Sequence, residues 1–260
     1  MEPSTTELLD AITDIARKAG DIIMEIYGGE IEVMTKADSS PVTLADQAAE
    51  DYIIPALVDL TPDIPIVAEE AASAGQIPDI SGSRFWLVDP LDGTKEFISR
   101  NGEFTVNIAL VEDGRPVLGV IYAPALKRIF NGALGQGASC QEGDAPAQAI
   151  STRPAPEDGL SIVASRSHGQ GPEMDAFISG LNIREEKPAG SSLKFCLIAA
   201  GEADVYPRFG RTMEWDTAAG HAVLLAAGGS VTKVDGTPLL YGKKGLDNPH
   251  FIAWGSKATN

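Results

Sequence analysis

The chain has 260 residues, of which 43% are hydrophobic and 22% charged, and its formal net charge is −17. This composition is typical of a globular protein with one large or two modest domains, and no apolar run approaches the roughly 20 residues that a membrane span needs. The excess of acids argues against a nucleic-acid polymer as a partner, because such binding needs basic surface. A site for a small phosphate would need bound metal or locally placed cations.

The N-terminus lacks the basic and apolar regions of a signal peptide, and Cys140 and Cys196 show no zinc or redox spacing. We therefore expect a cytoplasmic protein with reduced thiols. Peripheral association with the inner membrane face stays open, as does the oligomeric state.

The first half of the chain predicts alternating helices and strands. Residues 71–83 are rich in Ala, Ser, Gly and Pro without periodicity, and we expect a loop there. In chain order the expected elements are an apolar-faced helix over 8–26, a strand over 31–35, a polar loop over 36–41, a helix capped by Thr43, a strand over 64–68, a strand over 85–88, a hairpin over 104–122 and a strand with a glycine turn over 129–137.

The stretch from Trp86 to Phe97 carries the clearest chemical signal. Its strand ends at Asp89 and Asp92, and a turn at Asp92-Gly93 could aim both carboxylates and the Leu91 carbonyl at one point. Such oxygen ligands suit Mg²⁺. If Thr94 opens a helix, the amides of Gly93 and Thr94 would face the same point, where an anion would be attracted. On this stretch alone, an ordinary strand-to-turn connection with solvated acids is an equal alternative.

The second half is separated from the first by residues 141–159, whose Ala, Pro, Glu and Asp content indicates a boundary between subdomains. The alternation of strands and helices predicts a layered, mixed α/β architecture. The expected elements beyond the boundary are a strand over 160–164, a helix over 172–180, a strand over 182–187, a helix capped by Ser191 and Ser192 that stops at Gly201, a strand over 203–208, a helix over 218–227 and a last clear strand over 230–234.

Four acids fall at strand or helix ends and form a candidate metal set: Glu69, Asp89, Asp92 and Asp216. Taken singly, each acid has an ordinary explanation. Glu69 would be a solvated residue at a strand end, and Asp216 and Asp46 would each interact favourably with the dipole at the N-terminus of a helix. Together with the Leu91 carbonyl, the four would supply oxygen ligands for two or three Mg²⁺ ions.

Three segments, Val67–Ala71, Trp86–Thr94 and Glu214–His221, resemble the signature motifs of the inositol monophosphatase superfamily, in matching order and separation over essentially the whole chain. That family consists of Mg²⁺-dependent, Li⁺-sensitive phosphatases. Four further segments closely resemble its branch of bacterial CysQ-type 3′(2′),5′-bisphosphate nucleotidases: Asp92–Phe97, Asn101–Leu110, Gly190–Ala199 and Tyr206–Gly210.

The resemblance assigns roles residue by residue. The family's metal ligands fall on Glu69, Asp89, the Leu91 carbonyl, Asp92 and Asp216. Its catalytic positions fall on Asp46 and Thr94, which would activate the attacking water, and on Glu69, with Lys36 in a nearby loop.

The nucleotide contacts of the branch fall on residues that include the few cations of the second half. Lys194 and Arg208 could pair with the phosphate that is not cleaved. Without the resemblance, we would expect Lys194 to lie on a solvated helix face, Arg208 to be a surface charge at a strand end, and His168 to be an ordinary loop residue. The implied substrate-binding residues are Gly93, Thr94, His168, Ser191, Lys194, Arg208 and Asp216.

The resemblance implies a layered α/β/α/β/α sandwich of the inositol monophosphatase and fructose bisphosphatase type. We expect residues 1–150 to form an N-terminal α+β subdomain with most metal ligands, and residues 151–260 a C-terminal α/β subdomain with Asp216 and the substrate contacts. The implied reaction is Mg²⁺-dependent hydrolysis of the 3′-phosphate of adenosine 3′,5′-bisphosphate to AMP and phosphate, which belongs to sulfur metabolism and nucleotide recycling. The alternatives are an inositol or other sugar-phosphate monophosphatase, or a non-catalytic regulatory protein on the same fold.

Overall fold

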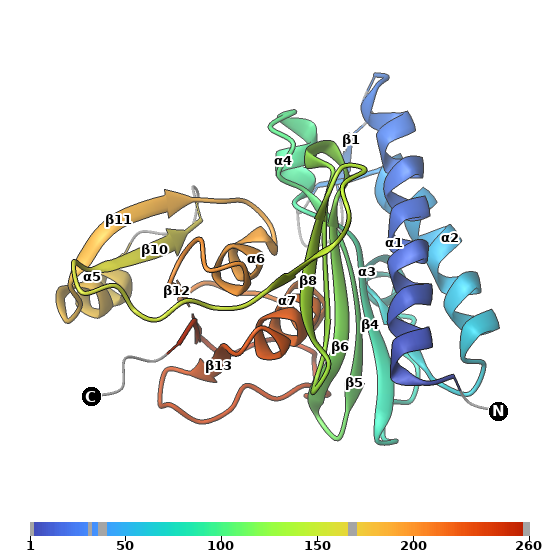
Figure 1. Cartoon of the computed structure of the whole chain (residues 1–260). Coiled ribbons are helices and arrows are strands. Elements are labelled where there is room, and N and C mark those ends of the chain that lie inside the picture. Colours follow the sequence, from blue (N-terminus) through green and yellow to red (C-terminus); the bar gives the residue numbers. More distant parts are fainter. Residues whose placement is uncertain (1–2, 31–32, 36–40, 166–170, 257–260) are drawn as a thin grey trace.

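The computed structural model describes residues 3–30, 33–35, 41–165 and 171–256. Within them the chain forms two larger sheets with helices on both sides of each (Figure 1). A separate two-stranded pair joins β1 (Val33–Thr35) to β2 (Pro41–Thr43). Among the described residues, no helix combines the length and the apolar character that crossing a lipid bilayer requires.

The first sheet has seven strands in the order β3-β4-β5-β6-β7-β8-β9 and is antiparallel except for the parallel pair β3–β4. The hairpin expected over 104–122 is its β5–β6 pair. The strands are β3 (Ile66–Ala68), β4 (Arg84–Asp92), β5 (Thr105–Glu112), β6 (Arg115–Ala123), β7 (Arg128–Ala133), β8 (Gly137–Glu142) and β9 (Gln148–Ile150).

The two faces of the first sheet are covered by different helices, which explains the continuous apolar run of β4. Successive side chains of a strand point to opposite faces. Trp86 and Val88 pack with helices α1 (Thr5–Tyr27) and α2 (Leu44–Leu60), while Phe85 and Leu87 belong to the core shared with the second half of the chain. Because both faces are buried, β4 cannot alternate between apolar and polar residues.

The second sheet has five strands in the order β11-β10-β12-β14-β13. Helices α6 (Leu193–Ala199) and α7 (Glu214–Ala226) lie between the two sheets, and α5 (Pro172–Ser179) packs on the outer face of the second (Figure 1). The predicted α/β/α/β/α layering is confirmed. The strands are β10 (Leu160–Ala164), β11 (Ile183–Pro188), β12 (Val205–Arg208), β13 (Ser230–Lys233) and β14 (Phe251–Trp254).

Several element predictions are wrong. The last strand is β14 rather than the one over 230–234, and β14 lies between β12 and β13 in the sheet. Residues 71–73 belong to a short helix, α3 (Glu69–Ser73), instead of a loop. The segment over 141–159 is not all irregular, because it contains β9; the first sheet ends there at Ile150, and the division of the chain at that residue stays a prediction. Ser192 occupies the N-cap position of α6 but its side chain makes no capping bond.

Candidate active site

Three acids from separate elements meet at one point. Glu69 begins α3, Asp89 lies in β4, and Asp216 lies in the first turn of α7. Each offers a carboxylate oxygen within 4.8 Å of the other two. The parallel register of Ala68 with Val88 places Glu69 and Asp89 side by side, because each residue directly follows its paired neighbour.

Burial and mutual repulsion act strongly on this cluster. The side chain of Asp89 is only 1% exposed. Its pKa is raised well above the ordinary value, first by burial and then by the charges of Glu69, Asp92 and Asp216. The pKa of Asp216 is raised as well, by burial and by Asp92 and Glu69. An all-oxygen set of crowded carboxylates fits Mg²⁺, whose charge would offset the repulsion.

Asp92 and Leu91 lie where β4 departs from regular pairing with β5. The register shifts between Asp89 and Asp92, and the Leu91 amide donates to Asp89 Oδ1 at 3.0 Å. Asp92 Oδ2 accepts a hydrogen bond from Ser191 Oγ at 2.6 Å. Asp92 therefore adjoins the three-acid cluster and also contacts the second half of the chain.

Thr94 and Asp46 are paired, as the resemblance implied. Thr94 is the first residue of α4 (Thr94–Ile98), and its hydroxyl donates to Asp46 Oδ1 at 3.1 Å. The predicted cap of α2 is present at Thr43, whose amide and hydroxyl each donate to Asp46 Oδ2 at 2.7 Å. Thr43 thus fixes one carboxylate oxygen of Asp46, and the other oxygen accepts the hydrogen bond from Thr94. Gly93, between the acids and α4, has a left-handed φ of 92° that few other residues adopt.

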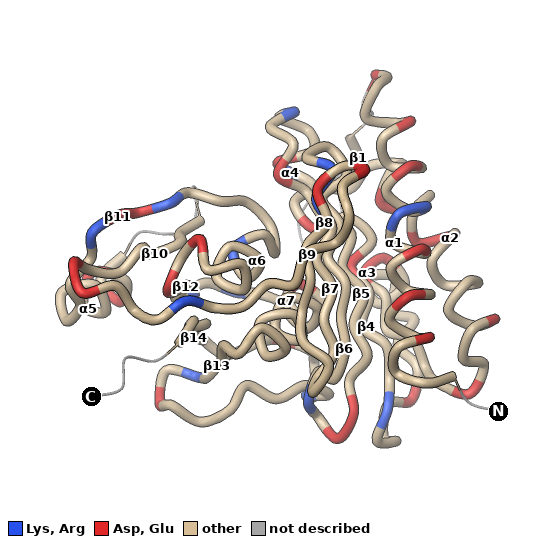
Figure 2. Tube along the Cα trace, in the orientation of Figure 1, with Lys and Arg blue, Asp and Glu red and all other residues tan. Residues whose placement is uncertain are grey.

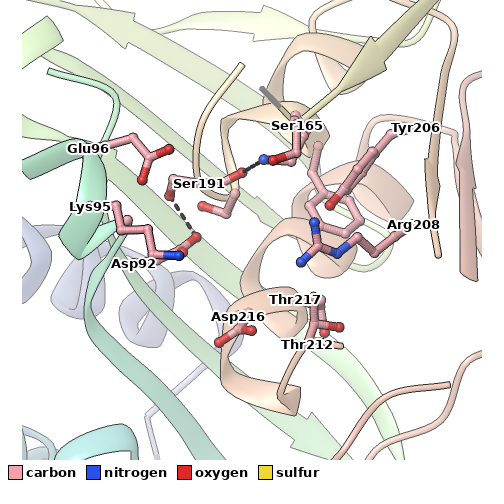
Figure 3. A pocket seen from close by; sticks show the side chains of 14 residues that line it. Asp92, Lys95, Glu96, Ser165, Ser191, Tyr206, Arg208, Thr212, Asp216 and Thr217 are labelled. Atoms are coloured by element: carbon pink, nitrogen blue, oxygen red, sulfur yellow. Dashed lines mark hydrogen bonds between the residues drawn. The ribbon is translucent and has the colours of Figure 1, made fainter. Parts of the chain in front are cut away.

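A cavity of about 140 Å³ opens beside the acids, between the two sheets (Figure 3). Six of the predicted site residues line it, together with others that the sequence did not single out. Those six are Asp92, Gly93, Ser191, Lys194, Arg208 and Asp216. Figure 3 shows Arg208 on one side of the cavity, Asp92 with Lys95 on the other, and Asp216 below and between them. Acids and cations therefore border the same space.

Lys194 is not on a solvated helix face. It is 5% exposed, and its ammonium donates to the carbonyls of Ser191 at 2.5 Å and Ala189 at 3.2 Å. Burial lowers its pKa to about 8, although the charge of Asp92 acts in the opposite direction. The ammonium thus braces the turn that carries Ser191, a residue with a positive φ of 49°.

Arg208 is half-buried at the end of β12. One of its terminal nitrogens donates to the Arg211 carbonyl at 3.0 Å, while its buried Nε has no hydrogen-bond partner among the described residues. A buried donor without a partner is costly and suits an anion. Two expected contacts, His168 and Lys36, lie outside the described residues.

Three polar residues around the site escaped the sequence interpretation. Two of them lie on β5. Thr105 contacts Ser191, with Thr105 Oγ1 lying 2.5 Å from Ser191 Oγ, and Asn107 donates a hydrogen bond to Asp92. Glu50, on α2, contacts the start of α3. The available signal was Glu50's spacing of four residues from Asp46, which places both acids on one helix face. For β5, the signal was a pair of polar residues in an otherwise apolar strand.

Known proteins match this chain along nearly its whole length. The model of the inositol monophosphatase family matches residues 4–258. The 3′(2′),5′-bisphosphate nucleotidase CysQ of Escherichia coli (strain K12) is 47% identical over 247 residues, which cover 94% of this chain and 98% of that protein. The crystal structure of CysQ from Bacteroides thetaiotaomicron superimposes with a TM-score of 0.79 at 41% identity, covering 95% of this chain and 97% of that one. An inositol monophosphatase from Anabaena (Nostoc) sp. PCC 7120 gives a TM-score of 0.74 at 27% identity, covering 95% and 90%.

Proposed function

The chain belongs to the inositol monophosphatase family, and we propose that it is a 3′(2′),5′-bisphosphate nucleotidase that hydrolyses adenosine 3′,5′-bisphosphate to AMP and phosphate. The observation that carries the proposal is the cavity that Asp216, a member of the three-acid cluster, lines together with Arg208 and Lys194. Such a site has a place for a phosphate that is cleaved and cations for a second phosphate that is not.

Phosphatases of this family are generally Mg²⁺-dependent. We propose that Glu69, Asp89 and Asp216 hold Mg²⁺, with Asp92 and the Leu91 carbonyl as ligands at the edge of the cluster, for two or three ions in all. When bound, Mg²⁺ supplies Lewis acidity and neutralises phosphate charge at this point. We also propose a catalytic role for Glu69, because its carboxylate belongs to the cluster that would hold the metal.

The water-activating pair in this proposal is Thr94 and Asp46. Asp46 accepts the Thr94 hydroxyl hydrogen, which leaves the Thr94 oxygen free to accept a hydrogen bond from the attacking water. The proton that the water loses would be held by this pair. Phosphoryl transfer asks a protein mainly for positioning and charge neutralisation, which a site of acids, amides and two cations can supply.

We propose that the cleaved phosphate lies against the amides of Gly93 and Thr94 and near Asp216, and that Arg208, Lys194 and Ser191 contact the rest of the nucleotide. The Arg208 Nε without a partner supports this placement. His168 remains a proposed contact from the resemblance alone.

The test is phosphate release from adenosine 3′,5′-bisphosphate, inositol monophosphate and fructose 1,6-bisphosphate at saturating Mg²⁺. We expect kcat/KM to be highest for the adenosine bisphosphate, with phosphate and AMP as products. A preference for inositol monophosphate would identify the alternative, a sugar-phosphate monophosphatase. No hydrolysis of any substrate would favour a regulatory protein. We also expect inhibition by Li⁺ but not by equal Na⁺, as in the family.

A further inference from the structure

The short helix α3, which begins at Glu69, has no cap of its own. Its N-cap residue is Ala68, whose side chain cannot accept a hydrogen bond, so the first-turn amides need acceptors from elsewhere. Glu50 of α2 supplies them. Its two carboxylate oxygens accept from the amides of Glu70 and Ala71, both at 2.8 Å.

The Glu50 carboxylate is costly where it lies. It is 2% exposed and contacts the two residues that directly follow Glu69, a member of the acid cluster. The two backbone hydrogen bonds offset the cost of burying this carboxylate, but its charge adds to the repulsion within the neighbouring acid cluster. A Ser or Asp at position 68 would satisfy the same helix end locally. Unlike a local cap, Glu50 links the start of α3 to α2.

Glu50 lies one helical turn after Asp46, and both side chains are buried on the same face of α2. Asp46 fixes Thr94, at the start of α4, and Glu50 fixes the start of α3. A five-residue helix does not hold its own geometry in isolation. One rigid helix thus aligns two short ones, each of which begins with a site residue.

We propose that Glu50 is a positioning residue that sets the orientation of Glu69 and thereby the metal affinity of the cluster. This inference rests on the proposed function, in which Glu69 is a metal ligand. Fixing both amides with a two-oxygen acceptor holds the backbone at position 69. The Glu69 carboxylate is thereby kept within reach of Asp89 and Asp216.

The test compares Glu50→Gln with the full-length wild type. Gln has nearly the same shape but one acceptor oxygen, and its amide group would face a backbone N–H as donor against donor. We expect Mg²⁺ binding, measured by calorimetry without substrate, to weaken about tenfold, as for other groups that orient metal ligands. The Mg²⁺ concentration for half-maximal activity should rise by a similar factor, with kcat at saturating Mg²⁺ changed less than threefold. Glu50→Asp, which keeps both oxygens, should recover part of the affinity.

Asp204→Asn is the matched control. Asp204 is also a buried carboxylate, 5% exposed, and accepts from the Ser161 amide at 2.7 Å, but it belongs to the second sheet's surroundings. The Asp204→Asn substitution should lower the melting temperature of the protein without changing its Mg²⁺ affinity. An Mg²⁺ affinity of Glu50→Gln equal to that of wild type or of Asp204→Asn would overturn the inference. Wild type that binds Mg²⁺ but releases no phosphate would overturn the proposed function instead, and wild type that binds no Mg²⁺ would overturn both.

Discussion

At the scale of one residue, Asp216 shows that the candidate site lowers the stability of the metal-free protein. Its pKa is raised by burial and by the charges of Asp92 and Glu69, so the ionised form is disfavoured in the metal-free protein. The Met213 amide, which donates to Asp216 Oδ2 at 2.8 Å, favours the ionised form but does not outweigh these effects. Strain of this kind is typical of functional sites, where stability is traded for activity.

We predict that Asp216→Asn lowers kcat by several orders of magnitude while raising the stability of the metal-free protein by roughly 0.5–2 kcal/mol. Asn removes the repelled charge but can still accept from the Met213 amide. Phosphate release and urea unfolding in EDTA would measure the two effects. A variant with near-normal turnover at saturating Mg²⁺ would rule out Asp216 as a metal ligand.

Arg208 and Lys194 should differ when mutated, because their hydrogen bonds differ. Arg208→Met removes a cation whose Nε has no partner among the described residues, so KM for adenosine 3′,5′-bisphosphate should rise about tenfold, the loss of one charge-assisted hydrogen bond of about 1.5 kcal/mol. Hydrolysis of inositol monophosphate, if measurable, should hardly change. Lys194→Met should reduce kcat for both substrates, because the Lys194 ammonium also braces Ser191. Equal losses for the two substrates in Arg208→Met would contradict a role specific to the second phosphate.

The same residues show how far the sequence could predict the site. Glu69, Asp89 and Asp216 were identifiable because each is an acid near an expected strand or helix end, and because the resemblance of their motifs assigned them as metal ligands. The burial of Lys194 was not predictable, since a lysine on a helix normally faces water, and only the packing of α6 between two sheets places it inside. Glu50 escaped for a related reason. Its contacts with α3 are made to backbone amides, so the identity of the side chains at the start of α3 does not indicate them.

At the scale of elements, helix α7 determines how closely the two halves of the chain meet. It packs on the first sheet at glycines, where backbones approach closely. A Cβ at Gly119 of β6 would lie 2.9 Å from both the Cα and the carbonyl oxygen of Ala219. Sequence periodicity predicted α7 as an element but not its partner sheet. Likewise β14 was missed, because its four residues, Phe-Ile-Ala-Trp, lack flanking alternation and acquire their pairing only from β12 and β13.

We predict that Gly119→Ala lowers the free energy of unfolding by about 1–3 kcal/mol, because the added methyl group meets helix backbone that cannot move aside without shifting α7. Asp216 would shift with the helix, so activity should fall as well. Gly82→Ala is the control, since nothing lies within 4 Å of its added methyl group. Denaturant unfolding of both variants would measure the effect, and equal stabilities would show that the α7 contact tolerates a side chain.

At the scale of the whole molecule, the net charge of −17 is unevenly placed. Figure 2 shows Asp and Glu along α1 and α2, the layer farthest from the second sheet, with few Lys or Arg among them. Arg208 and Lys194 instead border the cavity between the sheets. This separation lets a polyanion meet positive charge locally despite an acidic protein. The division at residue 150 stays a prediction, since α7 from the second half packs against the first sheet.

Global stability should depend on pH through His221, which is buried in α7 and whose pKa burial lowers to about 3. Between pH 6.5 and 3 the unfolded chain binds a proton that the folded protein does not, so this group's contribution to stability is lost as pH falls. From pH 7 to 5 the loss is about 2 kcal/mol. His221→Asn should remove that part of the pH dependence in urea unfolding, whatever the crowded acids contribute in both proteins. Identical pH dependence in variant and wild type would mean that His221 is protonated in the fold.

Helix α7 also links the synthesis of the chain to the completion of its active site. The nascent chain emerges N-terminus first, so β4 to β9 can pair while Glu214–Ala226 is still unmade. Until then the face of the sheet around Gly119 is open to water and to other chains. The helix that finally covers this face is the one that brings Asp216. A polypeptide cut short before it would therefore display the apolar surface that chaperones and proteases recognise, and the same incomplete molecule would lack a metal ligand.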